Sequence, residues 1–245
     1  IITKTAADTP GTEFGVRVGS FNTVNAWTQH GGKWGNVDVA AYVRVGQTDG
    51  FKQSVNADSQ TWLDSIFSTQ ASLAPGRVNT GFEAWDGSLD LSYQKLRLRL
   101  GYKLRDKGQT GVGVTAALDP VGRVKSERIN ADLSWRGIVL AKDWDLDVMA
   151  SYLHYTQQIP VWLQLLPPGA FNGAFPAGML GSPNTWERQI RGSVVFTYSG
   201  WAGHQIRLGL GHDDLDMYRT QEFKNFTQAS EQMSAEQRVL FDEAV

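Results

Sequence analysis

The segment Leu96–Arg105 reads LRLRLGYKLR, and its pattern decides the fold class. One side of the segment carries Leu96, Leu98, Leu100, Tyr102 and Leu104, and the other carries Arg97, Arg99, Gly101, Lys103 and Arg105. Alternation with a period of two indicates a β-strand with one apolar and one polar face. Five successive apolar positions opposite four cations are unusual for the surface of a soluble sandwich. The segment is therefore typical of a strand that lies between hydrocarbon and water.

The same alternation recurs along the chain and predicts an all-β, antiparallel protein. We expect nine strands, near residues 12–20, 22–30, 36–48, 87–94, 96–106, 124–136, 143–157, 186–199 and 203–219. Their length of roughly 8 to 16 residues suits a tilted membrane strand with an extension beyond the bilayer. Aromatic residues near the strand ends, such as Trp135, Trp144, Tyr198 and Trp201, match the aromatic girdles of membrane barrels.

The composition excludes several classes of function. The net charge of −2 argues against a nucleic-acid partner, and the absence of cysteine removes disulfides, thiolate zinc sites and cysteine nucleophiles. The most apolar stretch, Val161–Phe171, is far too short for a transmembrane helix. No nucleophile with a matching base, no metal-ligand spacing and no cofactor-binding loop can be assembled, so we do not expect an enzyme, a bound metal or a cofactor.

The predicted connections alternate between short and long. Short ones are expected at Gly31–Asn36, Gln94–Lys95, Gly137–Lys142 and Gly200–Gly203, and long ones at 49–86, 107–123, 158–185 and after residue 219. This is the pattern of outer-membrane barrels, which have short periplasmic turns and long extracellular loops. The connection near Ser20–Asn22 is an exception because it is short where a long loop is due. Within the first long loop, Asp58–Gln70 is expected to form a capped helix.

Several short motifs, in order along the chain, resemble those of TonB-dependent outer-membrane receptors. Ile1–Lys4 (IITK) resembles the NIITK end of their plug domain, and Gly19–Thr23 (GSFNT) resembles the turn of their first barrel hairpin. Gly31–Gly35 (GGKWG) resembles the next periplasmic turn, and Gln47–Phe51 (QTDGF) resembles the DSDGFR that follows their third strand. The segments around Leu118–Pro120 and Gly211–Asp214 also resemble loops of some members. The resemblance runs to about residue 227.

This resemblance implies a domain organisation and a set of partners. Residues 1–8 would be the end of a plug domain and its link to the barrel, and 9–227 would be barrel strands with extracellular loops. Residues 228–245 would be a loop segment at which the chain is truncated. The nine strands would belong to a barrel of 22 strands in the outer membrane of a Gram-negative bacterium. The partners would be outer-membrane lipid, the plug domain of the same parent chain, the TonB–ExbB–ExbD energy complex and a small-molecule ligand, such as a ferric siderophore.

Two sets of side chains are candidates for a functional site. Aromatic residues in the predicted loops are suited to covering a bulky ligand, namely Trp62, Phe67, Trp85, Trp162, Phe171 and Phe175. The alternative is that they pack the loops onto one another. Cations on the polar strand faces would line the lumen, contact the plug and attract anionic ligands, namely Arg17, Arg44, Arg97, Arg99, Arg105, Arg128, Arg191 and Arg207. The alternative is that nearby aspartates simply balance them.

Two other functions fit parts of the sequence. A passive porin would need a complete barrel with an even number of strands and no plug, and Ile1–Lys4 argues against it. A soluble β-sandwich that acts as a binding module would need Leu96, Leu98, Leu100, Tyr102 and Leu104 to face a buried core. We expect active uptake of a scarce nutrient, for which a ferric siderophore is the first candidate.

Overall fold

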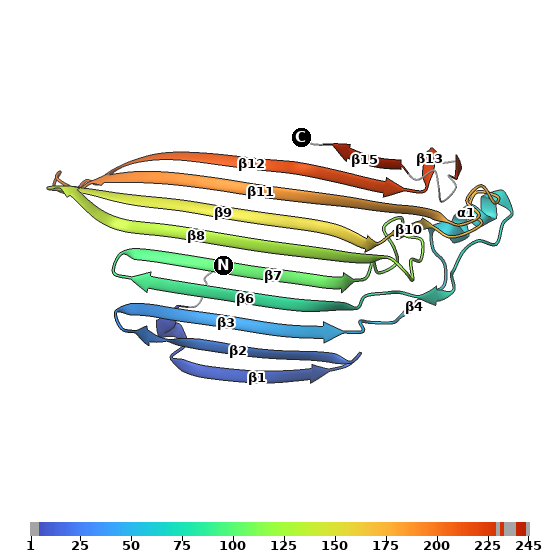
Figure 1. The fold of residues 1–245 in the computed structure, drawn as a ribbon, viewed down its shortest axis with the longest axis horizontal. Helices are drawn as coiled ribbons and strands as arrows, with labels where there is room; N and C mark the ends of the chain where they lie inside the picture. The colour runs from blue at the N-terminus through green and yellow to red at the C-terminus, as the bar shows by residue number, and fades with distance from the viewer. Residues whose placement is uncertain (1–4, 229–230, 233–238, 244–245) are drawn as a thin grey trace.

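The protein is dominated by one large antiparallel sheet. The computed structural model describes residues 5–228, 231–232 and 239–243. The strand order is β1-β2-β3-β6-β7-β8-β9-β11-β12-β15, and β10 pairs with β11 beside this path (Figure 1). Strand residues make up 66% of the protein and helix 5%, so the prediction of an antiparallel all-β fold is confirmed.

All nine strands expected from the sequence are present in the main sheet. They are β1 (Gly11–Gly19), β2 (Thr23–Trp34), β3 (Val37–Thr48), β6 (Phe82–Tyr93), β7 (Leu96–Gly108), β8 (Arg123–Ala141), β9 (Trp144–Val161), β11 (Met179–Tyr198) and β12 (Ile206–Lys224). The sheet also contains β10 (Leu163–Leu166) and β15 (Val239–Glu243). Two small pairs lie outside it, β4 (Ser54–Val55) with β5 (Gly76–Arg77), and β13 (Phe226–Gln228) with β14 (Glu231–Gln232). The described residues also form two helices, η1 (Ala6–Asp8) and α1 (Ser59–Phe67).

Several strand boundaries differ from the prediction, and glycine explains the clearest case. Gly137 was expected to begin a turn, but β8 continues through it to Ala141. The register shifts between Trp135 and Ile138, and Gly137 has a φ of 62° at this irregularity. A bulge needs this backbone conformation as much as a turn does. The actual turn is at Lys142 and Asp143, and Asp143 has a φ of 65°.

The long connections gather at one end of the sheet and form a small core of their own. Figure 1 shows α1, β4, β10 and β13 at this end, whereas the turns that join β6 to β7, β8 to β9 and β11 to β12 lie at the other. The buried residues of the loop core are Ala117, Leu166, Ala170 and Phe175. Asp58 caps α1, as expected from the sequence, because its carboxylate accepts a hydrogen bond from the Thr61 backbone N–H at 2.9 Å.

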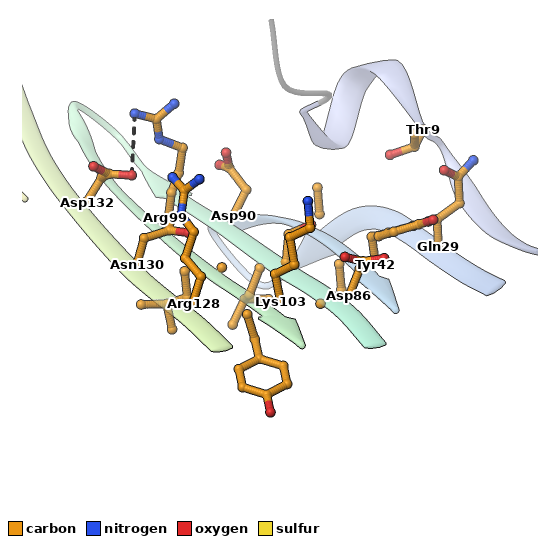
Figure 2. A pocket seen from close by; sticks show the side chains of 18 residues that line it. Thr9, Gln29, Tyr42, Asp86, Asp90, Arg99, Lys103, Arg128, Asn130 and Asp132 are labelled. Atoms are coloured by element: carbon orange, nitrogen blue, oxygen red, sulfur yellow. Dashed lines mark ion pairs between the residues drawn. The ribbon is translucent and has the colours of Figure 1, made fainter. Parts of the chain in front are cut away.

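The sheet has two chemically different faces, which we call convex and concave. Cross-strand pairs such as Leu98 with Leu133 carry the apolar residues to the convex face. Pairs such as Arg99 with Asp132 carry the charged residues to the concave face, around which the strands curve (Figure 2). Within the described residues, no second sheet covers the convex face, where Leu100 is 39% and Leu133 45% exposed. This exposure disagrees with a buried sandwich core on that side.

The two ends of the chain are described only in part. The residues of the IITK motif, 1–4, lie outside the described residues. After residue 227, where a loop was expected, Val239–Glu243 forms β15 and pairs with Thr220–Lys224 of β12. Residues 229–230, 233–238 and 244–245 also lie outside the described residues. No helix in the described part of the chain is long and apolar enough to cross a membrane.

Candidate functional site

Aromatic side chains form two rows on the convex face. The row near the short turns contains Trp135, Trp144 and Tyr198, and the row nearer the loops contains Trp85, Tyr102 and Tyr152. The rings of Trp144 and Tyr198 pack with centroids 4.9 Å apart. From β6 to β11, aliphatic residues, glycine and Phe196 occupy the convex positions between the rows. Amphipathic rings on both borders of an apolar band match the two interfaces of a bilayer.

The apolar band moves diagonally across the sheet rather than following the cross-strand pairs. At its loop-side edge, the last apolar residue of one strand faces a polar residue of the next in three pairs: Leu104 with Glu127, Ile129 with His154, and Ile190 with Asp214. From β7 to β12, the band therefore shifts toward the short turns. A planar layer that crosses tilted strands produces such a shift, because its border cuts each strand at a different register position.

The concave face carries a network of ion pairs between neighbouring strands. The Asp86 carboxylate accepts a hydrogen bond from Arg44 Nε at 2.7 Å, and its Oδ1 lies 2.9 Å from Arg105 Nη2. The Asp90 carboxylate binds Arg97 in a bidentate manner, at 2.9 Å from Nε and 2.6 Å from Nη2. These five side chains are at most one-third exposed. They hold three strands in register through charge-assisted hydrogen bonds.

All eight arginines predicted to line the lumen lie on the concave face according to the register of their strands. Five of them have an acidic partner. Besides the three just described, Arg99 Nη2 lies 3.9 Å from Asp132, and Arg191 Nη2 lies 2.7 Å from Asp213. Among the described residues, no carboxylate pairs with the other three, Arg17, Arg128 and Arg207. The sequence predicted the face of each arginine but not which aspartate it contacts.

A cavity of about 620 Å³ lies on the concave face between β2 and β8. Figure 2 shows the charged and polar side chains that surround it, and Thr9, next to η1, lies at its opposite wall. The charged residues at this cavity are Asp86, Asp90, Arg99, Lys103, Arg128 and Asp132, and its neutral polar residues include Gln29, Tyr42, Ser88 and Asn130. Its size is in the usual range for small-molecule sites.

Glycines shape this cavity by letting neighbouring groups approach the sheet. A Cβ atom on Gly31 would lie 2.1 Å from the Thr9 carbonyl oxygen, so only glycine permits the segment after η1 to pack on β2. A Cβ atom on Gly101 would lie 2.5 Å from Asn130 Oδ1, so glycine also lets the Asn130 amide lie across β7. Sequence reasoning missed Gln29, Tyr42 and Asn130 as site residues. Their alternation places them on the polar face, but only the register brings them to one cavity.

The six loop aromatics predicted to contact a ligand do not converge on one site. Phe67 and Phe175 both contact Phe171 edge to face, with centroids 5.4 and 5.9 Å apart, and Phe175 is fully buried. These three side chains therefore pack the loops against one another, as the alternative interpretation expects. Trp62 lies on α1 and is 64% exposed.

The remaining two aromatics lie on the convex face or beside it. Trp85 was placed in a long loop, but β6 begins at Phe82 and carries Trp85 into the aromatic row nearer the loops. The Trp162 ring packs on Phe223 with centroids 6.1 Å apart, at a second cavity of about 610 Å³. Binding of a ligand by any of the six stays a prediction.

Carboxylates in the loops have structural partners. Two forces oppose each other at Asp64: burial raises its pKa, whereas hydrogen bonds from Thr69 Oγ1, Gln60 Nε2 and the Ser72 backbone N–H lower it. The hydrogen bonds prevail, and the pKa of Asp64 is about 2. At Asp58 the same balance, with a hydrogen bond from the Leu118 backbone N–H, also lowers the pKa. Both groups stay ionised and fix the loop backbone.

In the part of the chain that the structure describes, no three histidine, aspartate or glutamate side chains are grouped as metal ligands. Comparison with models of protein families, with curated protein sequences and with solved structures finds no match for this chain. The function proposed below therefore depends on the geometry of the two faces and on the resemblance of the short motifs.

Proposed function

We propose that this chain forms part of the wall of a transmembrane β-barrel that takes up a scarce nutrient across the outer membrane of a Gram-negative bacterium. The observation that carries the proposal is the diagonal apolar band on the convex face, which is bordered by two aromatic rows and includes many exposed side chains such as Leu100 and Leu133. Contiguous apolar surface of this extent is rare on proteins that fold in water. Contact with hydrocarbon would make such a band stable. The sheet would contribute nine strands of a barrel of 22.

The concave face supports a wet interior that is at least partly filled by polypeptide. Five of its eight predicted arginines form ion pairs while staying partly exposed, which suits a water-filled or plugged lumen. The segment at η1 already packs on this face, in the groove that Gly31 leaves free. This observation favours a plugged transporter over a passive porin, whose lumen is open. The plug domain of the same parent chain would fill the rest.

The loop end supports a role as the extracellular, ligand-facing end. Its long connections carry their own core around Phe175, so they form a folded cap rather than loose links. Stable loops at one end and short turns at the other match the asymmetry of outer-membrane barrels.

The resemblance to TonB-dependent receptors adds the energy source and the kind of cargo. In such receptors, a TonB–ExbB–ExbD complex drives transport of ligands such as ferric siderophores, and we propose the same for this protein. Growth of a deletion strain on single iron or carbon sources would identify the cargo. Unimpaired growth on every ferric siderophore that supports the parent strain would contradict the first candidate.

Single arginine substitutions on the two faces test the membrane assignment. Leu98→Arg places a charge in the apolar band, and Ser193→Arg places the same charge on the concave face of β11, outside the cavity. We expect Leu98→Arg to destabilise the protein in lipid vesicles by about 2–4 kcal/mol and Ser193→Arg to have little effect. Unfolding by urea in vesicles measures both. Equal tolerance of the two arginines would contradict the proposed function.

A further inference from the structure

The cavity on the concave face contains more positive charge than its aspartates neutralise. Asp86 is engaged by Arg44 and Arg105, and Asp90 by Arg97. Asp132 is the acidic neighbour of Arg99. Each carboxylate at the cavity therefore already has an arginine partner. Two further cations at the cavity, one on β7 and one on β8, have no carboxylate partner among the described residues.

These two cations, Lys103 and Arg128, are direct cross-strand partners. Figure 2 shows both side chains rising from the sheet on the cavity side. On its other side Lys103 faces Asp86, but no Lys103–Asp86 ion pair forms, and both oxygens of that carboxylate bind arginines. Arg128 faces Tyr155 on its other side. Among the described residues, neither cation has an ion-pair partner, and like charges placed directly opposite each other destabilise a sheet.

Neutral hydrogen-bonding groups surround the two cations. Asn130 follows Arg128 on the same face of β8, and the missing Cβ of Gly101 lets its amide lie over β7 at the cavity. Tyr42, whose side chain carries a hydroxyl, also lines the cavity. Two cations, an amide and a hydroxyl around one space form a set of donors for an oxyanion, because charge-assisted hydrogen bonds to oxygen are the strongest of their kind.

We propose that Lys103 and Arg128 bind the anionic group of a small ligand, a carboxylate or a phosphate, in this cavity. The bound anion removes the repulsion between the two cations and accepts hydrogen bonds from Asn130 and Tyr42. The proposal deepens the proposed function, since it rests on a concave face that lines a wet interior. It specifies that the ligand carries an anionic group and that this group binds on the concave face of β6, β7 and β8.

Binding of simple anions to the whole chain, refolded in detergent micelles, tests the proposal. The probes are inorganic phosphate and citrate, and the readout is the urea midpoint of unfolding, because a ligand that binds the folded state raises it. We expect both probes to raise the midpoint above that in sodium chloride of equal ionic strength. Lys103→Gln and Arg128→Gln should each weaken the apparent affinity roughly tenfold.

Two arginines provide matched controls. Arg17 and Arg207 lie on the same face without an acidic partner among the described residues, but outside the cavity. Arg17→Gln and Arg207→Gln should leave the effect of phosphate and citrate unchanged. An equal rise of the urea midpoint in sodium chloride would overturn the proposal and indicate general screening of charge. An equal loss of affinity in the control variants and in the cavity variants would do the same.

A second measurement needs no ligand. Lys103→Gln removes the repulsion, so at low salt and without polyvalent anions it should raise the midpoint of unfolding, and high salt should abolish this gain. A lowered midpoint at low salt would mean that Lys103 already has a stabilising partner, which contradicts an empty anion site. Neither measurement needs lipid around the convex face, so their failure is distinguishable from failure of the membrane assignment.

Discussion

Apolar side chains follow opposite rules in two regions of this protein. In the long loops at one end of the sheet, which we call the loop cap, Phe175 and Ala170 of the loop core are fully buried and pack with neighbouring aromatic residues. On the convex face of the sheet, Leu133 and Leu208 are 45% and 60% exposed, although the sheet is regular and well paired. The chain is thus able to bury apolar residues where it folds in water. The proposed function explains the exposed band by contact of the sheet with hydrocarbon instead of water.

Removing an aromatic ring from the loop core should cause the largest loss of stability among the substitutions that test this difference between the two regions. Phe175→Ala leaves a cavity in a fully buried site, so we expect the loop cap to lose about 3–5 kcal/mol of stability. Hydrogen exchange of the loop amides measures this loss, and the exchange of β7–β9 should not change.

The exposed Trp62 on α1 provides the control. Trp62→Ala should change the same exchange rates by no more than about 0.5 kcal/mol, since exposed side chains away from special features contribute little. Equal effects of the two substitutions would mean that the loops have no packed core, and the contrast with the convex face would disappear.

A smaller effect is expected from the ion pairs of the concave face. Asp86→Asn keeps the shape of the side chain but removes the charge shared by Arg44 and Arg105, and should cost about 1–3 kcal/mol. Asp38→Asn is the matched change at an exposed pair, where Lys33 Nζ lies 3.7 Å away, and should cost less than about 0.5 kcal/mol. Urea unfolding at low and high salt compares them. A loss of stability on Asp86→Asn no larger than on Asp38→Asn would indicate that the ion pairs of the concave face are fully hydrated.

The smallest effect concerns the acid sensitivity of the loop cap. The pKa of Asp64 is about 2 in the folded protein, below its ordinary value of 3.8. A lowered pKa in the folded state means that the ionised form stabilises the fold. This contribution is fully present above the ordinary value and is lost as the pH falls toward 2. Asp64→Asn should reduce the acid-induced rise in loop exchange over this interval, and an unchanged rise would contradict the hydrogen-bonded role of Asp64.

The sequence was sufficient for the nine long strands and for the two faces, because alternation of side chains is a local property, but β10 and β15 lie where loops were expected. It also predicted the helix after Asp58, where the cap is local. It could not assign Gly137 to a bulge rather than a turn, since both need the same backbone conformation. It could not place Trp85 in β6, because the polar and aromatic residues before Gly87 do not alternate clearly.

The site itself depends on long-range register, which the sequence pattern does not contain. Arg99 and Asp132 were both expected on the polar face, but only the pairing of β7 with β8 makes them partners. The same pairing leaves Lys103 opposite Arg128. A shift of two residues in either strand would preserve both faces and would create a different cavity, so the anion site was not predictable from alternation alone.

The accessibility of successive residues along β8 tests the central claim most directly. The chain contains no cysteine, so single cysteines at Ala131, Asp132, Leu133, Ser134 and Trp135 report without background. In lipid vesicles, we predict that lipid-soluble thiol reagents label positions 131, 133 and 135, and that water-soluble reagents label 132 and 134. Labelling of all five positions by the water-soluble reagent, or an absence of alternation, would contradict a convex face that meets hydrocarbon.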